Sequence, residues 1–194
     1  MSHQFEKLSC CLNHLCSTLD KYDRHITHGF GYDSHSTDYK ILRVVIDEDE
    51  DDDDSDDEVF TTWVQVYSLA RGYWKSLTAS VIPVAFQDGS GRSVFVNGTF
   101  HTVEACYGNY NDGDMVIGTF KLATEEFGEM MGPEALRQDS CSIARYSLTL
   151  ISHYNYEFGD RGCDIWVMRQ YGVAESWTKL FNVYAVRVGR HIWF

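Results

Sequence analysis

Three similar hairpin patterns, spaced about fifty residues apart, limit the folds open to this chain more than any other feature. Each pattern has a run of alternating apolar and polar residues, a polar turn of four to seven residues, and a second run that begins with an aromatic residue. The three segments are VQVYSLARGYWKSL (64–77), IGTFKLATEEFGEM (117–130) and IWVMRQYGVAESWTKLF (165–181). Their leading aromatic residues, at spacings of 53 and 50 residues, are Trp74, Phe127 and Trp177. Two-residue periodicity interrupted by turns predicts antiparallel hairpins, repeated in units that stack on one another.

Further strand-like runs precede the hairpins, at residues 39–46, 93–103 and 146–152. Each unit therefore offers three or four strands, and a period near fifty with several short strands is typical of kelch-type propeller blades. The sequence predicts an all-β fold, a partial kelch-like β-propeller of about three blades of antiparallel strands. Stacking of the blades is expected to bury the aromatic residues of the hairpins, which are Trp74, Phe127, Trp166 and Trp177. The alternative is an ordinary β-sandwich whose hairpins resemble one another by chance.

The acidic residues are concentrated in one segment. Residues 47–58 read DEDEDDDDSDDE, and removing these eleven acidic residues from the formal net charge of −13 leaves −2. A run of this density repels itself and is expected to be a disordered loop. It lacks the glycine turn and distal glutamate of a calcium loop, so no metal is predicted, but it could attract a basic protein partner by long-range steering. Nucleic-acid binding is not expected, because 16 basic residues face 29 acidic ones and form no cluster.

Signals for membrane insertion or secretion are absent from the sequence. No apolar window is long enough for a membrane span, and the first residues, MSHQFEKLSCCLNHL, lack a basic leader and a clean hydrophobic segment. We therefore expect a protein of the cytoplasm, the nucleus or both, without membrane contact. Its six cysteines are expected to be reduced and to serve mostly as small buried apolar groups, since they lack the paired spacing of a zinc site.

Catalytic and cofactor-binding motifs are also absent from the sequence. No two of the eight histidines have the spacing of a zinc helix, and there is no nucleophile elbow or phosphate-binding glycine loop. We interpret Gly29 and Gly31 as turn formers. Glu125 and Glu126 are adjacent, so both would be solvated in a turn, and a joint acid–base role is not expected. The sequence predicts no enzyme activity and no cofactor.

Five sequence blocks together resemble a known family. They are GFGYDSHSTDYKILRVV (29–45), VQVYSLARGYWKSL (64–77), FVNGTFH (95–101), FKLATEEFGEM (120–130) and DIWVMRQYGVAESWTKLF (164–181). In this order they are similar to the plant F-box-associated domain, the kelch-like β-propeller that follows the F-box in plant F-box proteins, including the S-locus type. The resemblance implies a protein-binding module that recognises substrates for a Skp–cullin–F-box ubiquitin ligase. In that family the F-box docks a Skp-type adaptor, the propeller holds the protein to be degraded, and the receptor itself performs no chemistry.

The sequence departs from the family pattern near its beginning. Residues 1–28 have neither the length nor the leucine-proline pattern of an F-box, so we expect an irregular segment there and no basis for binding a Skp-type adaptor. Residues 29–194 are expected to form a truncated F-box-associated propeller domain that contains the acidic loop 47–58. Closing a propeller takes at least four blades, so an open sheet edge is expected at each end.

Candidate partner contacts lie in loops, because blades hold their loops rigidly on two faces of a propeller. The candidate loops are 31–38, 47–58, 105–114 and 153–162. The last two are rich in tyrosine, asparagine and glycine, a composition that suits adaptable protein contact. The predicted contact residues are Tyr107, Tyr110, Tyr154 and Tyr156. Two other readings stay open, a truncated or decayed F-box protein copy without ligase assembly and a small enzyme whose site the motifs miss.

Overall fold

The computed structural model describes residues 25–48, 60–78, 81–86, 93–103, 115–136, 140–144, 148–155, 161–185, 187–188 and 191–192. These residues form three antiparallel four-stranded sheets, which we call blades 1, 2 and 3, and one two-stranded sheet. Blade 1 consists of β1 (His25–Asp33), β2 (Asp38–Glu48), β3 (Phe60–Ser68) and β4 (Tyr73–Leu77). Blade 2 consists of β5 (Val94–Val96), β6 (Thr99–Val103), β7 (Val116–Lys121) and β8 (Glu126–Met131). Blade 3 consists of β9 (Ser140–Ala144), β10 (Thr149–Asn155), β11 (Arg161–Met168) and β12 (Trp177–Ala185).

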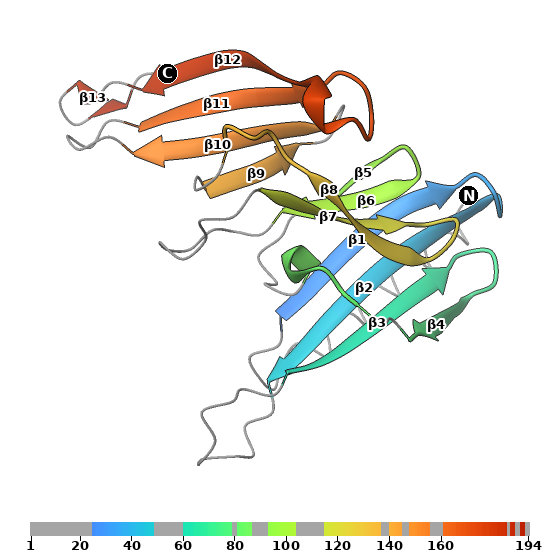
Figure 1. Ribbon diagram of the computed structural model, residues 1–194. Coiled ribbons are helices and arrows are strands. Elements are labelled where there is room, and N and C mark those ends of the chain that lie inside the picture. Colours follow the sequence, from blue (N-terminus) through green and yellow to red (C-terminus); the bar gives the residue numbers. More distant parts are fainter. Residues whose placement is uncertain are drawn as a thin grey trace.

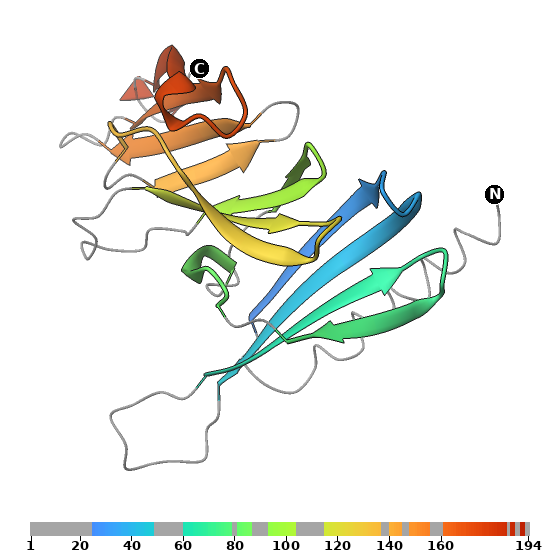
Figure 2. The same ribbon diagram turned by 45° about the vertical axis from the view of Figure 1, so that its right-hand side comes forward.

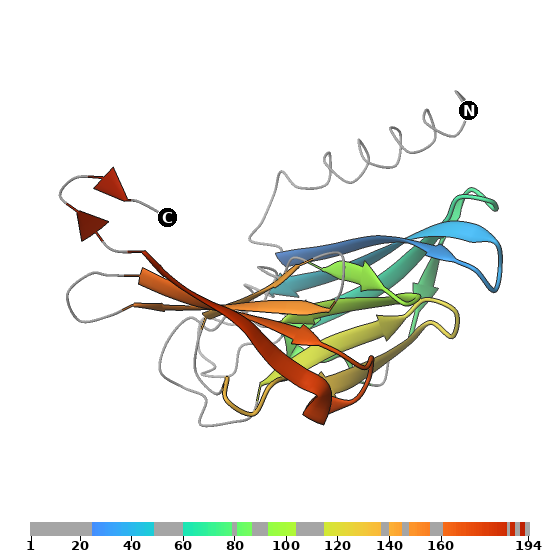
Figure 3. The same cartoon turned by 90° about the horizontal axis from the view of Figure 1, so that it is seen from above.

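Two kinds of short element accompany the blades. The two-stranded sheet pairs β13 (Arg187–Val188) with β14 (His191–Ile192) and lies beyond β12 (Figures 1 and 3). The short 3-10 helices are η1 (Val84–Phe86), between β4 and β5, and η2 (Ala174–Ser176), between β11 and β12. Within the described part of the chain, no helix has the length and apolar character needed to cross a membrane.

The three blades are stacked face to face in the order of the chain. Each sheet is a meander in which every strand pairs with its neighbours in the chain. Blade 2 lies between blades 1 and 3 in both side views (Figures 1 and 2), and the first strands approach one another, since β1 contacts β5 and β6 while β6 contacts β9. The predicted all-β fold, a partial propeller of three blades, is confirmed.

The strand registers show which residues of the blades are equivalent. The predicted hairpins are β3–β4, β7–β8 and β11–β12. Cross-strand partners form one row in blade 1, which is Trp74, Tyr67, Ile41 and Phe30. The matching row in blade 2 is Phe127, Phe120, Phe100 and Phe95. We call these the aromatic rows. In blade 2 the row packs against blade 1, and in blade 1 the row lies on the face that points away from blade 2.

Two hydrophobic clusters fill the junctions between blades. The junction of blades 1 and 2 contains the buried residues Leu42, Val44, Val64, Val66, Phe86, Phe100, Phe120 and Leu122. The junction of blades 2 and 3 contains the buried residues Val94, Val103, Ile117, Leu136, Ile143, Leu148, Leu150, Met168 and Trp177. Blades 1 and 3 therefore each bury one face against blade 2, and blade 2 buries both of its faces. Stacked sheets gain in this way stability that a single sheet lacks.

The interpretation of Gly29 and Gly31 as turn formers is wrong. Both glycines lie within β1. A Cβ atom on Gly29 would lie 2.5 Å from the Phe100 ring, and one on Gly31 would lie 2.5 Å from the Phe95 ring. The glycines are therefore needed because two rings of blade 2 lie directly on the β1 backbone.

The observed ends of β1 and β2 differ from the predicted segment boundaries. β1 begins at His25, and the buried hydroxyl of Thr27 donates a hydrogen bond to the carbonyl of Phe86, so ordered structure starts before residue 29. β2 continues to Glu48, which pairs with Phe60, so two residues of the acidic run belong to a strand. The rest of the predicted irregular segment and of the predicted acidic loop lies outside the described residues, and both stay predictions.

Candidate functional site

The predicted tyrosine contacts fall mostly outside the described residues. Tyr107, Tyr110 and Tyr156 lie there entirely, whereas Tyr154 belongs to β10 and pairs with Gly162, with its side chain outside the description. The strands do show where these loops start and end. The connections β2–β3, β6–β7 and β10–β11 are the second connection of each meander, so they leave the blades at one end of the molecule (Figure 1). The strand residues that flank the predicted loops 47–58, 105–114 and 153–162 lie at that end, whereas the β1–β2 turn within the predicted loop 31–38 lies at the opposite end.

At the opposite end, a polar cleft of about 320 Å³ separates the turns of blade 1 from the β7–β8 turn of blade 2. The buried ammonium group of Lys40 lies 2.8 Å from a carboxylate oxygen of Asp33 and 3.6 Å from one of Glu125. Lys75 forms a second ion pair with Glu125. Glu125 of blade 2 therefore joins two lysines of blade 1 across the junction.

Asp33 is held in its charged form. Burial alone would raise the pKa of this carboxyl group. Hydrogen bonds from Lys40 Nζ, Ser36 Oγ and the backbone N–H of His35 act in the opposite direction and lower the pKa to about 2. The carboxylate is thus an acceptor for its neighbours across the whole physiological pH range.

The backbone of Glu125 has an unusual conformation for a residue with a side chain. Its φ angle is 58°, in the left-handed region, and its N–H donates to the carbonyl of Lys121. The same place in the β3–β4 turn of blade 1 is taken by Gly72, with φ 74°, and Gly172 in the β11–β12 turn has φ 80°. Strain at a non-glycine residue persists where the surroundings require that side chain, and here the two ion pairs supply the requirement. The expectation that Glu125 is a solvated turn residue is therefore wrong.

The charged groups of this cleft link blade 2 to blade 1. Asp38 accepts hydrogen bonds from the Ser68 hydroxyl and from the backbone N–H of Ala70, so it too is engaged within blade 1. Each carboxylate of the cluster thus has cationic or N–H and O–H partners nearby, and none is left to act as a base. The cleft positions blade 2 against blade 1.

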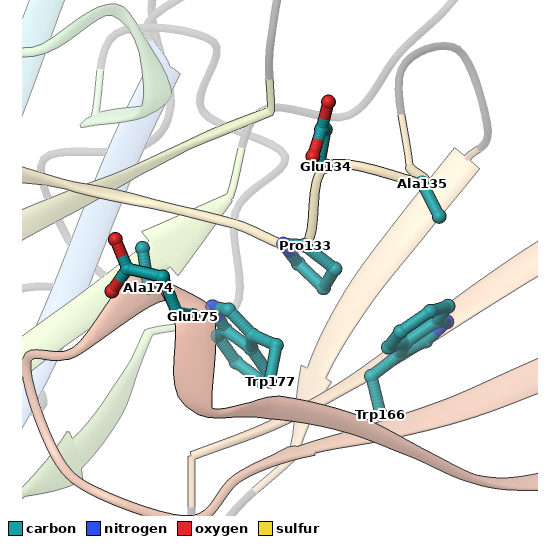
Figure 4. A pocket seen from close by; sticks show the side chains of 7 residues that line it. All are labelled: Pro133, Glu134, Ala135, Trp166, Ala174, Glu175 and Trp177. Atoms are coloured by element: carbon teal, nitrogen blue, oxygen red, sulfur yellow. The ribbon is translucent and has the colours of Figure 1, made fainter.

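An open hollow of about 500 Å³ lies between blades 2 and 3. Its lining residues are Pro133, Glu134, Ala135, Trp166, Ala174, Glu175 and Trp177. Figure 4 shows Pro133 between the two indole groups, with the carboxylates of Glu134 and Glu175 at the margin. Indole faces and carboxylates together suit an aliphatic side chain that ends in a cation, because the indole attracts both the stem and the charge.

Two features fix the tryptophans of the hollow. The 9%-exposed Trp177 donates from its indole N–H to the carbonyl of Met131 at 3.0 Å, which ties β12 to the end of β8. Trp166 is half-buried, and Lys179 lies over its ring at 5.8 Å from the centroid. The sequence predicts both tryptophans as packing residues, but their role as walls of a hollow needed the position of Pro133, which no sequence pattern signals.

The other two predicted blade aromatics lie in different surroundings. Phe127 packs against the junction of blades 1 and 2, with its ring 4.8 Å from that of Phe120. Trp74 packs on Tyr67 at 5.2 Å on the face of blade 1 that points away from blade 2. Trp74 therefore does not lie between two of the described sheets, in contrast to the expectation.

A buried histidine lies at the same junction as the hollow. His101 of β6 is fully buried, and its Nε2 lies 3.0 Å from the hydroxyl of Tyr171 in the β11–β12 turn. Burial lowers the pKa of His101 to about 4, against an opposing effect of the Val94 and Thr99 backbone groups, so the ring is neutral at pH 7. Within the described residues, His101 Nδ1, Ser152 Oγ and Trp166 Nε1 are buried without a hydrogen-bond partner.

Comparison with known proteins agrees with this architecture. A family model described as F-box associated beta propeller domain matches residues 14–194. The chain belongs to this family. Domains of the family are known as interaction domains of F-box proteins and not as enzymes.

Several F-box proteins of Arabidopsis thaliana are similar to this F-box associated propeller. An F-box/kelch-repeat protein is 25% identical over 171 residues, which cover 81% of the chain and 40% of the relative. The F-box protein CPR1 is 31% identical over 179 residues, which cover 82% of the chain and 40% of the relative. The chain thus spans about 40% of the length of these relatives. No solved structure gives a significant match.

Proposed function

We propose that this F-box associated propeller binds a protein client, as the substrate-recognition part of a Skp–cullin–F-box ubiquitin ligase. Membership of the family and the F-box names of the relatives support the ligase role. The observation that most favours protein binding is the tryptophan hollow, because tryptophans that line an open recess are typical anchors of protein interfaces.

We propose further that the client is basic. In the hollow, Glu175 is exposed, and Figure 4 shows its carboxylate at the margin, on the side of Trp177 away from Trp166. A lysine or arginine side chain of the client would place its stem on the indoles and its charge near the carboxylates. The acidic run would attract the same client from a distance.

Affinity capture from plant cell extract, with the purified chain as bait, tests the hollow. The variants Trp166→Ala and Glu175→Lys are expected to lose the proteins that the unaltered chain retains. The matched control is Tyr73→Ala, because Tyr73 is a 50%-exposed aromatic residue on β4, away from the hollow. Retention of the same proteins by the unaltered chain and by all three variants would contradict a role of the hollow in client binding.

Two further measurements separate the parts of the proposal. Titration of the full chain with a purified Skp-type adaptor tests ligase assembly, and binding in the micromolar range would support it. Client capture without adaptor binding would reduce the function to that of a stand-alone binder, and an aggregating bait with neither activity would favour a decayed copy. Deleting residues 49–58 keeps β2 intact and should slow client association at low salt but not at high salt.

A further inference from the structure

Two contacts inside the chain show how each kind of basic side chain uses a tryptophan ring. In blade 1 the guanidinium carbon of Arg43 lies over the ring of Trp74, 4.5 Å from its centroid. The Nε group of Arg43 donates to Oε1 of Gln65 at 3.1 Å, and its Nη2 group donates to the same oxygen. The guanidinium group therefore contacts an indole with its flat face and makes hydrogen bonds with its edge at the same time.

Lysine behaves differently in blade 3. The ammonium group of Lys179 forms an ion pair with Asp164 and lies 5.8 Å from the ring centroid of Trp166. An ammonium group is a compact, strongly hydrated charge, so it stays at its carboxylate and makes only a long contact with the ring. Trp166 lines the hollow between blades 2 and 3, whereas Lys179 is not among the lining residues. The side of the Trp166 ring away from the hollow is therefore already next to a positive charge.

The hollow separates its indole groups from its carboxylates. The ring of Pro133 and the two indoles form its apolar walls. Figure 4 shows the carboxylate of Glu175 on the side of Trp177 away from Trp166, and that of Glu134 at another part of the margin. A basic side chain that enters the hollow thus meets flat aromatic walls first and negative charge only at the edge.

We propose that the client side chain held in the hollow is arginine, with its guanidinium plane on the indole of Trp166 and its N–H groups directed toward the carboxylates at the margin. This inference rests on the proposed function, in which the hollow binds a basic client. Guanidinium has two flat faces and five N–H groups that point outward in its plane, so it can use the ring and a carboxylate together. An ammonium group has no flat face, and it would have to leave either the indoles or the carboxylates.

Lys179 strengthens this preference. Its positive charge on the far side of the Trp166 ring opposes any second cation on the near side, most strongly one whose charge is concentrated on a single atom. Guanidinium spreads its charge over the whole group, and its flat contact with the indole adds dispersion attraction that the charge of Lys179 does not affect. Lys179 is thus a specificity-determining residue of the hollow, although it does not line it.

Titration of the full chain with two short peptides tests the proposal by nuclear magnetic resonance. The peptides are acetyl-Gly-Gly-Arg-Gly-Gly-amide and its counterpart with a central lysine, and the reporter is the indole N–H signal of Trp166, identified by its loss in Trp166→Phe. The arginine peptide is expected to bind more tightly by about 5-fold. The indole signal of Trp74 is the internal control, because Arg43 already lies over that ring and neither peptide should shift the signal.

Lys179→Gln tests the cause of the preference. Asp164 keeps the hydrogen bond from the Asn182 side-chain amide at 2.6 Å, so the variant does not leave this carboxylate without a partner. The lysine peptide is expected to gain more affinity than the arginine peptide, which narrows the difference between them. The matched control is Arg71→Gln, which makes the same change in charge at an exposed position in the β3–β4 turn of blade 1. Circular dichroism confirms that each variant is folded.

The outcomes separate this inference from the proposed function. Equal or tighter binding of the lysine peptide by the unaltered chain would overturn the arginine preference and leave the basic client in place. A chain that binds neither peptide at the hollow would overturn both. A difference between the peptides that Lys179→Gln leaves unchanged would refute the role of Lys179.

Discussion

The junction of blades 1 and 2 is closed by rings that lie on a glycine-bearing strand, whereas the junction of blades 2 and 3 contains tryptophans, a neutral histidine and an open hollow. At the first junction Phe100 lies directly on Gly29, and ion pairs of Glu125 join the turns. At the second, buried polar atoms such as Ser152 Oγ lack a partner within the described residues. A junction with buried rings and paired charges is suited to hold blades in place, and one with a recess and exposed carboxylates is suited to receive a partner.

The largest expected effect concerns the second junction. Trp177→Ala removes a side chain that is 9% exposed, together with its hydrogen bond to Met131. We expect the free energy of unfolding to fall by about 3–5 kcal/mol, as for other buried aromatic residues. Urea denaturation followed by circular dichroism measures the change. A loss below about 1 kcal/mol would mean that Trp177 is not a core residue of this junction.

Gly29→Ala tests the first junction in the same way. The added Cβ atom would lie 2.5 Å from the ring of Phe100, which is fully buried. Overpacking of this kind lowers the free energy of unfolding by about 1–3 kcal/mol. Gly98→Ala is not a suitable control, because Gly98 has φ 74°, so Ser76→Ala on the exposed edge of β4 serves instead. Equal stability of Gly29→Ala and the unaltered chain would contradict the close approach.

Acidification should weaken the second junction through His101. Its pKa is lowered from 6.5 to about 4 in the folded chain, so between these values the unfolded chain binds more protons. The contribution of neutral His101 to the free energy of unfolding is therefore fully present above pH 6.5 and decreases as the pH falls toward 4. Between pH 6.5 and pH 5 this decrease amounts to about 2 kcal/mol. His101→Gln should show a flatter pH dependence over this interval in urea denaturation. The same slope in both proteins would show that His101 is not buried in its neutral form.

The smallest expected effect concerns the turn of Glu125. Glu125→Ala removes both ion pairs and keeps the left-handed strain, whereas Glu125→Gly removes the ion pairs and relieves the strain. The glycine variant is therefore expected to be more stable than the alanine variant by about 1 kcal/mol. Thermal and urea unfolding of the two variants supply the comparison. Equal stabilities would remove the case for strain at this position.

The sequence predicted the blades better than their boundaries. The hairpins β3–β4, β7–β8 and β11–β12 were predictable because apolar and polar residues alternate on both sides of a polar turn in each of them. β1 was missed because glycines at positions 29 and 31 suggest turns, and only the location of Phe95 and Phe100 in blade 2 explains them. Such contacts depend on residues far apart in the chain, and local patterns do not encode them.

The candidate site was less predictable than the fold. Trp166 and Trp177 were singled out for their size, but the hollow exists because the connection after β8 brings Pro133 beside them. The ion pairs of Glu125 could not be inferred either, since Lys40 and Lys75 are distant in sequence and approach only when the blades stack. The four tyrosine contacts stay a prediction.

The most direct test of the stacked-blade account is a double-mutant cycle across the first junction. The Phe95 ring of blade 2 lies on Gly31 of blade 1, where a Cβ atom would be 2.5 Å from the ring. Gly31→Ala should therefore lower the free energy of unfolding by about 1–3 kcal/mol in the unaltered chain and by almost nothing in the Phe95→Ala background. The same loss in both backgrounds would contradict the account.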